Sequence, residues 1–234
     1  MFNIVVIGTG GTGSCFLQKL ARYCSVSAEK INVFVVDGDI VEEKNLVRQQ
    51  FCECNVGQSK AAALVELAAD NYGLEWTAVS EYLLHAEQLD DIFVNDVGNV
   101  KILVGCVDNH AARRIMEEWF SHQRNAIYID SANDEFDGEV VVSVRADGLE
   151  ISPMRSFFFP DVLTDDAPSV VELSCEQRNI SSPQHQATNE MAGNIIFMII
   201  CEIIKRQIPT GMVVFNAENF SMRRLPFTKG KLVV

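Results

Sequence analysis

The chain has 234 residues, of which 48% are hydrophobic and 22% charged, as expected for one globular domain with a sizeable core. Its 32 acidic residues outnumber its 19 basic residues and give a formal net charge of −13, which argues against general nucleic-acid binding. The longest apolar run is too short for a transmembrane helix, the start has no basic region of a signal peptide, and seven cysteines without a Cys-x-x-Cys pair predict a reduced, cytoplasmic protein with no membrane association.

Short apolar strands alternate with helical patterns over the first two-thirds of the chain. The predicted strands cover residues 3–7, 31–36, 77–79, 101–104 and 126–129, and the predicted helices cover about 12–23, 58–69 and 110–124. Short buried strands separated by helices are typical of a parallel sheet covered on both faces. The sequence therefore predicts a Rossmann-like, doubly wound α/β sheet that is mostly parallel.

The last third of the chain has a different pattern. It begins with two predicted hairpin strands, at 139–145 and 149–152, followed by a long proline-containing crossover at 153–183. An apolar helix is predicted at 186–206, and two closing strands at 212–215 and 221–225. These closing strands predict antiparallel additions to the sheet. Because no interdomain linker is visible, residues 1–234 are expected to form a single domain.

A glycine-rich segment follows the first predicted strand and opens the first helix. Gly8, Gly10 and Gly13 form the pattern G-x-G-x-x-G, and Gly11 is a fourth glycine inside it. Glycines permit a tight turn and a close approach of phosphates, and the helix N-terminus offers free N–H groups. Asp37 ends the second strand, where such folds place an acid that binds ribose hydroxyls. Residues 1–135 are thus the predicted nucleotide-binding half, although this pattern alone does not separate NAD, FAD, S-adenosylmethionine and ATP.

Five charged residues are expected to meet at the carboxyl ends of the parallel strands, where open α/β sheets bind ligands. They are Asp37, Asp39, Arg48, Lys60 and Asp108. Two cations suit a triphosphate, and a carboxylate suits Mg²⁺. Hydride transfer requires no such set of charges.

The sequence resembles the ThiF/MoeB/HesA family, the prokaryotic relatives of ubiquitin-activating enzymes. The matching motifs are G-x-G-G-x-G-S at 8–14, D-x-D-x-V-x-x-x-N-L-x-R-Q at 37–49, V-G-x-x-K at 56–60, D-N at 108–109, Gly138 and Ser174-Cys175. They span roughly residues 1–216. The compact length and the loop are also similar to ThiF-like proteins of plasmid-borne PRTRC gene clusters.

The resemblance implies ATP-dependent adenylation of the C-terminal carboxylate of a small ubiquitin-like protein or peptide that ends in Gly-Gly. It also implies a homodimer. By position, Asp37 would hold the ribose, Arg48 and Lys60 the phosphates, and Asp108 the Mg²⁺. Three further residues of the same motifs would shape the nucleotide pocket, namely Asp39, Asn45 and Gln49.

Cys175 matches the cysteine that, in some relatives, takes the activated tail as a thioester or acyl disulfide. A thiolate is a competent nucleophile towards an acyl-adenylate. The alternative is a crossover cysteine without a covalent role. We expect the other residues that attract notice to be structural. Cys106 should be a buried small residue, Arg113 and Arg114 should lie on a solvated helix face, and residues 157–159 should pack into the core.

The chain departs from the family at three places. Many relatives bind zinc through two Cys-x-x-Cys pairs, but residues 152–155 read Ser-Pro-Met-Arg here, so no zinc is predicted. In relatives a segment before the first strand supplies an arginine to the partner subunit; this chain begins at the strand, and Arg22 is the alternative source. The usual apolar, glycine-rich stretch after Cys175 is polar here, so recognition of the tail is expected to differ.

Three other functions compete with adenylation of a protein tail. The first is a non-catalytic nucleotide-binding or dimerisation module that retains the fold. The second is activation of a small-molecule or tRNA-linked carboxylate, which the net charge disfavours for a tRNA substrate. The third is a nicotinamide-dependent oxidoreductase, which would have no recognisable substrate domain and would leave N-L-x-R-Q unexplained.

Overall fold

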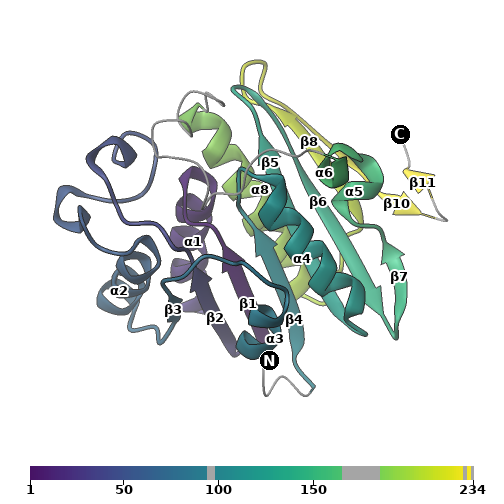
Figure 1. Ribbon diagram of the computed structural model, residues 1–234, viewed down its shortest axis with the longest axis horizontal. Coiled ribbons are helices and arrows are strands. Elements are labelled where there is room, and N and C mark those ends of the chain that lie inside the picture. Colours follow the sequence, from purple (N-terminus) through teal and green to yellow (C-terminus); the bar gives the residue numbers. More distant parts are fainter. Residues whose placement is uncertain (94–97, 165–184, 229–230, 233–234) are drawn as a thin grey trace.

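A mixed β-sheet forms the centre of the computed structural model, which describes residues 1–93, 98–164, 185–228 and 231–232 (Figure 1). The strands follow the order β3-β2-β1-β4-β5-β6-β8-β9, and β7 pairs with β6. Their bounds are β1 (Phe2–Ile7), β2 (Ile31–Val36), β3 (Thr77–Val79), β4 (Val100–Gly105), β5 (Ala126–Asn133), β6 (Asp137–Ala146), β7 (Leu149–Ser152), β8 (Gly211–Asn216) and β9 (Ser221–Leu225). A separate antiparallel pair joins β10 (Phe227–Thr228) to β11 (Lys231–Leu232).

The first five strands are parallel, and the remaining strands of the main sheet are antiparallel. Because β1 lies between β2 and β4, the strand order reverses at β1. In open α/β sheets such a reversal leaves a crevice at the carboxyl ends of the central strands. The predicted doubly wound, mostly parallel fold with antiparallel strands in the last third is confirmed.

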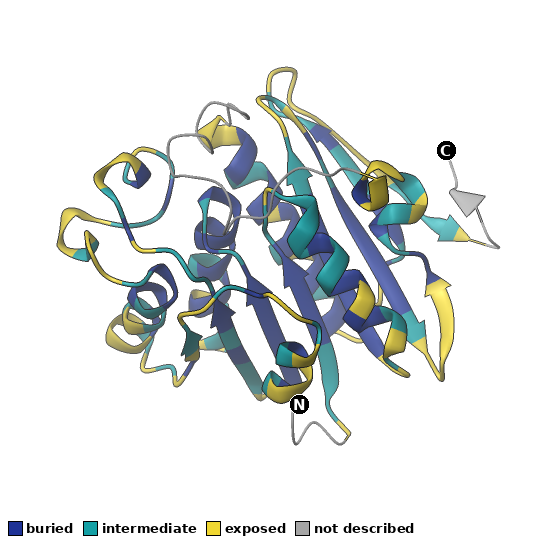
Figure 2. Cartoon of the chain, viewed as in Figure 1, coloured by how far each residue is buried: buried dark blue, intermediate teal, exposed yellow. Residues whose placement is uncertain are grey.

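Helices cover both faces of the sheet. On one face α1 (Gly11–Cys24), α2 (Lys60–Tyr72) and α8 (Gln186–Ile204) enclose the larger apolar core, which receives Ile4 and Val6 of β1. On the other face α3 (Glu87–Ile92) and α4 (His110–His122) pack on Val5 and Ile7. Both sides of β1 are buried, which explains why five of its six residues are apolar (Figure 2).

α8 is the one helix among the described residues that is long and apolar enough to span a membrane, by length and composition alone. Of its most apolar stretch, 56% is buried inside the fold. Its apolar side chains Ile196, Ile200 and Ile203 belong to the same core as α1 and β1. Burial against the sheet therefore accounts for its composition.

Each predicted strand and long helix is present, with ends that differ by a few residues. The sequence did not predict α3, or the short helices α5 (Arg155–Phe158) and α6 (Asp161–Thr164) inside the expected crossover. Helices of one or two turns are too short to show a hydrophobic period. The expectation of a core role for residues 157–159 is wrong for Phe157, which is 61% exposed because α5 buries Arg155 instead.

Candidate functional site

The glycine loop packs tightly against the end of β4. Gly8 has φ of +89°, and a Cβ atom at Gly8 would lie 2.7 Å from the carbonyl oxygen of Cys106. A Cβ atom at Gly13 would collide with the Gly8 carbonyl, so these two glycines bring the loop and α1 close to the sheet. A Cβ atom at Gly10 would meet only the Gln49 amide nitrogen at 4.0 Å. Gly10 is therefore the position where a ligand can approach the backbone at the start of α1.

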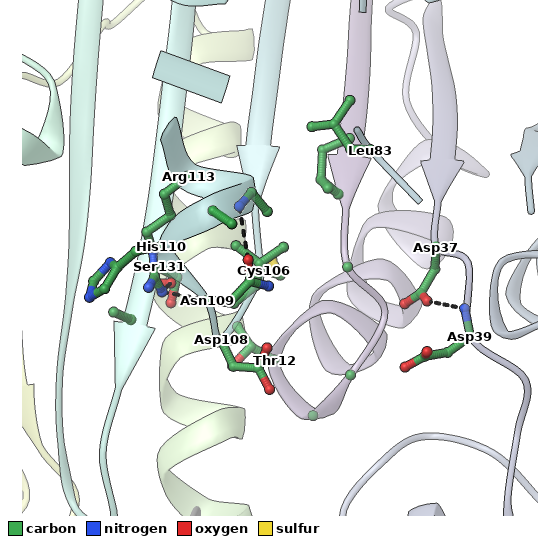
Figure 3. Close-up of a pocket in the computed structure, with 18 of the residues that line it drawn as sticks. Thr12, Asp37, Asp39, Leu83, Cys106, Asp108, Asn109, His110, Arg113 and Ser131 are labelled. Carbon is green, nitrogen blue, oxygen red and sulfur yellow. Dashed lines mark hydrogen bonds between the residues drawn. The ribbon is translucent and has the colours of Figure 1, made fainter. Parts of the chain in front are cut away.

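Asp37 fixes the loop to the end of β2. Its carboxylate accepts hydrogen bonds of 2.7 Å from both the backbone N–H and the hydroxyl of Thr9. It also accepts one of 2.8 Å from the N–H of Asp39, which Figure 3 shows. Burial raises the pKa of Asp37, while the charge of Lys60 and these hydrogen bonds oppose that shift. The side chain is thus held in one orientation beside the glycine loop.

Lys60 and Asp39 form an ion pair in the pocket that the glycine loop also lines. Lys60 is the first residue of α2 and is only 6% exposed, and its Nζ lies 3.1 Å from Oδ2 of Asp39. The hydroxyl of Tyr82 donates to the other oxygen of Asp39 at 2.5 Å. Tyr82 was not predicted as a site residue, although its place just after β3 puts it at the same edge of the sheet. The lysine is therefore held in place by a carboxylate that is itself fixed.

The segment that carries Arg48 and Gln49 is tied to the glycine loop. The N–H of Gln50 donates to the hydroxyl of Ser14, which in turn donates to the carbonyl of Gly10. Arg48 and Gln49 both line the pocket, and Gln49 is buried. The side-chain oxygen of Gln49 has no hydrogen-bond partner within the described ranges. This buried acceptor therefore belongs to a residue that lines the pocket.

The buried Asn45 shapes the same segment. Asn45 ends the short 3₁₀ helix η1 (Glu43–Asn45), and its side-chain oxygen accepts from the N–H of Glu42. Its backbone carbonyl accepts from the N–H of Gln49 at 2.9 Å. The asparagine of the N-L-x-R-Q motif thus closes the turn that brings Arg48 and Gln49 to the pocket.

The end of β4 supplies the opposite wall. Asp108 is exposed, and the next residue, Asn109, caps α4 by accepting from the N–H of Ala112 at 2.8 Å. Figure 3 shows Asp108 and Asn109 on one side of the glycine loop and Asp37 with Asp39 on the other. The capping asparagine begins the helix immediately after Asp108 and so leaves that carboxylate at the rim.

The prediction that Arg113 and Arg114 lie on a solvated face of α4 is wrong for both residues. Arg113 is 4% exposed, donates to the carbonyls of Val107 and Ser131, and pairs with Asp130 at 3.3 Å. Arg114 is half-buried and donates to the carbonyl of Val162. Both lie in the first turn of α4, which the sheet and α6 cover, so the amphipathic pattern of the whole helix does not describe this turn.

Arg155 and Glu139 extend this buried charge cluster. Arg155 NH1 lies 3.4 Å from Asp130 Oδ2, NH2 pairs with Glu139, and the guanidinium stacks over Phe159. Arg155 occupies the position of the second cysteine in the zinc motif of relatives. Within the described ranges no group of three or more His, Cys, Asp or Glu side chains is placed to hold a metal.

One cavity of about 850 Å³ gathers most of the predicted site. It is lined by ten of the predicted residues, namely Gly8, Gly10, Gly11, Asp37, Asp39, Asn45, Arg48, Gln49, Lys60 and Asp108. Gly13 lies beneath the loop, against Gly8 and Cys106. Cys175 lies outside the described residues. Cys106 also lines the cavity, but burial raises the pKa of its thiol, as expected of a small structural residue.

The chain matches a known protein family over almost its whole length. The model of the ThiF family matches residues 1–231. The chain belongs to the ThiF family. Two curated relatives are each 29% identical: ubiquitin-activating enzyme E1 2 of Arabidopsis thaliana over 114 residues, and adenylyltransferase and sulfurtransferase uba4 of Aspergillus niger over 118 residues. The alignments cover 47% and 50% of this chain but only 10% and 22% of those longer proteins.

Solved structures share the fold at low sequence identity. PaaA matches with a TM-score of 0.69 at 15% identity, covering 95% of this chain and 63% of PaaA. Escherichia coli MccB, solved with ATP, matches with a TM-score of 0.69 at 13% identity, covering 96% of this chain and 63% of MccB. Another structure holds MccB with AMPCPP and MccA. The chain thus spans less than two-thirds of each of these ThiF-fold proteins.

Proposed function

We propose that this member of the ThiF family catalyses ATP-dependent adenylation of a carboxylate. The observation that carries the proposal is one cavity that brings the glycine loop together with the charged residues predicted from the sequence. These are the cations Arg48 and Lys60 and the carboxylates Asp37, Asp39 and Asp108. The names of the curated relatives, an adenylyltransferase and a ubiquitin-activating enzyme, support the same activity. A hydride-transfer enzyme would leave the buried Lys60 and the tied Arg48 segment without a purpose.

The residues present fit a nucleoside triphosphate. The N-terminus of α1 is open at Gly10, has no acidic residue in its first turn, and offers the positive end of a helix dipole to a phosphate. Arg48 and Lys60 reach the same cavity from one side. Asp37, fixed beside Thr9, is placed to accept hydrogen bonds from ribose hydroxyls.

Asp108 is the residue proposed to hold Mg²⁺. Mg²⁺ is usually bound through one or two carboxylates together with phosphate oxygens and water, so an exposed carboxylate at the rim of a phosphate site fits it. When bound there, the ion would neutralise phosphate charge. The protein itself supplies fixed cations and N–H groups, which need no rearrangement as charge develops.

In the proposed reaction a carboxylate oxygen of the substrate attacks the α-phosphorus of ATP. A new bond forms between that oxygen and phosphorus, the bond from phosphorus to the bridging oxygen of the pyrophosphate breaks, and pyrophosphate leaves with the electron pair. Arg48 and Lys60 would stabilise the negative charge on the phosphate oxygens. Holding the two reactants in one cavity contributes the proximity term.

For the substrate we propose the C-terminal carboxylate of a ubiquitin-like protein or of a peptide. The relative named as a ubiquitin-activating enzyme and the structure of MccB with MccA support a macromolecular or peptide substrate. A Gly-Gly tail, transfer to Cys175 and a two-fold homodimer belong to the same proposal. They are what the resemblance to the ThiF/MoeB/HesA family implies, on the motifs at 37–49 and 174–175, and two-fold dimers are the commonest oligomers.

The decisive experiment is ATP–pyrophosphate exchange with Mg²⁺ in the presence of candidate ubiquitin-like proteins and short peptides. Exchange that depends on the added carboxylate supports adenylation. Asp108→Ala should remove most of it, whereas Asp147→Ala, an exposed carboxylate in the β6–β7 hairpin, should not. ATP binding without exchange for any carboxylate would favour the non-catalytic module. Absence of ATP binding would contradict the proposal.

A further inference from the structure

Two exposed cysteines lie side by side in the loop between β2 and α2. Cys52 and Cys54 flank Glu53 in the short 3₁₀ helix η2 (Glu53–Asn55), and their sulfur atoms are 2.6 Å apart. The four other cysteines that the structure describes are buried or half-buried, at positions 15, 24, 106 and 201. This pair of accessible thiols therefore differs from the other cysteines within the described ranges, whose thiols are shielded.

This turn belongs to the same loop as the predicted phosphate-binding residues. Gln49 lies three residues before Cys52, and Lys60 begins α2 a few residues after the turn. Backbone hydrogen bonds between Val41 and the pair Gly57 and Gln58 close the base of the loop. Because the two ends of the loop are held together, we expect a change in the turn at Cys52–Cys54 to shift the other residues of the same loop.

The reduced turn depends on the Cys52 thiol. Cys52 Sγ caps the backbone N–H of Asn55 and donates to the Asn55 side-chain oxygen at 3.0 Å, while the N–H of Cys52 donates to the same oxygen. A disulfide needs an S–S distance of about 2.05 Å and a dihedral near 90°. Forming that bond would remove the S–H that donates to Asn55, so the 3₁₀ turn would lose one of the hydrogen bonds that hold it.

We propose that Cys52 and Cys54 form a reversible dithiol–disulfide site, and that its oxidation moves the loop that presents Arg48 and Gln49. The second half rests on the proposed function, since it concerns nucleotide binding. In a reducing compartment such pairs are usually transient and redox-sensing rather than structural. A disulfide across one intervening residue is strained, and strained, exposed disulfides are the ones that are easily reduced again.

The oxidant we name is a low-molecular-weight disulfide such as oxidised glutathione. One cysteine thiolate attacks a sulfur of the oxidant, forms a mixed disulfide and displaces one glutathione thiolate. The second cysteine, having lost its proton to solvent, attacks the protein sulfur of that mixed disulfide and displaces the other glutathione. Two protein thiols are oxidised by two electrons, and one glutathione disulfide is reduced to two thiols.

The chain offers a direct assay for the bond. Trypsin cuts after Arg48 and after Lys60, and the peptide 49–60 between these sites contains Cys52 and Cys54 and no other cysteine. The full-length protein is equilibrated with oxidised and reduced glutathione, alkylated under denaturing conditions and digested without reduction. We expect an unalkylated peptide that is lighter than its dithiol form by two hydrogen atoms. Reduction with dithiothreitol followed by a second alkylation should convert it to the doubly alkylated form.

Variants separate this bond from other thiol chemistry. Cys175→Ser should form the same disulfide, which excludes Cys175 as the true partner. Cys52→Ser and Cys54→Ser should each leave a single cysteine that is alkylated or glutathionylated. A peptide 49–60 that stays fully alkylated at every glutathione ratio, or that is crosslinked to another peptide, would overturn the proposal.

The effect on the loop is read from ATP affinity. We expect oxidised wild-type protein to bind ATP at least threefold more weakly than reduced protein, and Cys52→Ser to show no difference between the two conditions. Equal affinities with the disulfide fully formed would overturn the coupling to Arg48 and Gln49. If the reduced protein does not bind ATP, the proposed function fails, while the peptide map still decides whether the redox site exists.

Discussion

The hydroxyl of Tyr82 donates a hydrogen bond of 2.5 Å to one oxygen of Asp39, and the other oxygen accepts from Lys60 Nζ at 3.1 Å. The ring of Tyr82 also covers Gly38, where a Cβ atom would lie 2.6 Å from it. The phenol and the ammonium therefore share one carboxylate. How strongly Asp39 holds Lys60 depends on the hydrogen bond that it receives from Tyr82.

Tyr82→Phe tests this relationship. Without the phenol, more of the negative charge of Asp39 is left to Lys60, and the lysine is less available to a phosphate. We expect the Kd for ATP to rise about threefold to tenfold, the equivalent of one ordinary hydrogen bond, with the fold unchanged because the ring over Gly38 remains. Isothermal titration with ATP measures it. Tyr23→Phe is the control, because that ring packs on Phe197 against the larger core, and equal affinities for the two variants would refute the idea.

Alanine substitutions at Gly13 and Gly148 distinguish the effect of close packing from the effect of backbone strain. In Gly13→Ala the new methyl would collide with the Gly8 carbonyl, so the glycine loop has to move. Gly148 has φ of +82° and open space around it, so Gly148→Ala adds only strain in the β6–β7 hairpin. Both should lower the free energy of unfolding by about 1–3 kcal/mol, as measured by urea titration. Only Gly13→Ala should also weaken ATP binding, and a matching loss in Gly148→Ala would contradict this role of the loop.

The strands, the long helices and the carboxyl-edge position of the site were predictable, because each depends on local patterns. A short, mostly apolar run such as residues 31–36 indicates a buried strand from its composition alone. The glycines indicate the turn after β1. The family motifs then assigned Arg48, Lys60 and Asp108 to one place, and the cavity brings them together. Order along the chain was enough here because parallel strands deliver their ends to one edge.

The rest depended on contacts between segments far apart in the sequence. Tyr82 reaches Asp39 across 43 positions, and Asn189 of α8 hydrogen bonds to Thr12 of α1 across 177. The buried position of Arg113 was missed because the helical period describes average exposure and not what covers the first turn. Arg155 was visible as a missing cysteine, but its pairing with Asp130 and Glu139 required the three-dimensional arrangement of β5, β6 and α5.

Asp37 gives a prediction in pH. Burial raises its pKa in the folded protein above the ordinary value of 3.8, so the folded state binds the proton more tightly than the unfolded state. Relative to Asp37→Asn, wild-type protein should gain free energy of unfolding as the pH falls towards 3.8, and should lose that gain as the pH rises through the folded-state pKa. Urea titrations of both proteins between about pH 4 and pH 8 measure the difference.

ATP affinity should follow the opposite trend. The ionised carboxylate is the acceptor for ribose hydroxyls, so wild-type affinity should fall as Asp37 takes up its proton, at a higher pH than an ordinary aspartate would. Asp37→Asn should bind weakly at every pH without this change. A difference in unfolding free energy that is flat with pH would show that the pKa of Asp37 is not raised.

Arg155→Met tests the charge cluster that joins α5 to β5 and β6. The substitution keeps an apolar chain of similar length. It leaves the half-buried Glu139 without the cation it pairs with, and the buried Asp130 with Arg113 as its remaining partner. Removing one member of such a pair costs about 3–5 kcal/mol, whereas an exposed pair contributes about 0–1 kcal/mol. Arg124→Ala, which removes an exposed partner of Asp147, is therefore the matched control. Chemical denaturation of both variants measures the difference in the free energy of unfolding.

Equal losses of unfolding free energy in the two variants would mean that the cluster is solvated in solution. A large loss that Glu139→Gln partly reverses in the double variant would show that the unpaired carboxylate, and not lost packing, carries the cost.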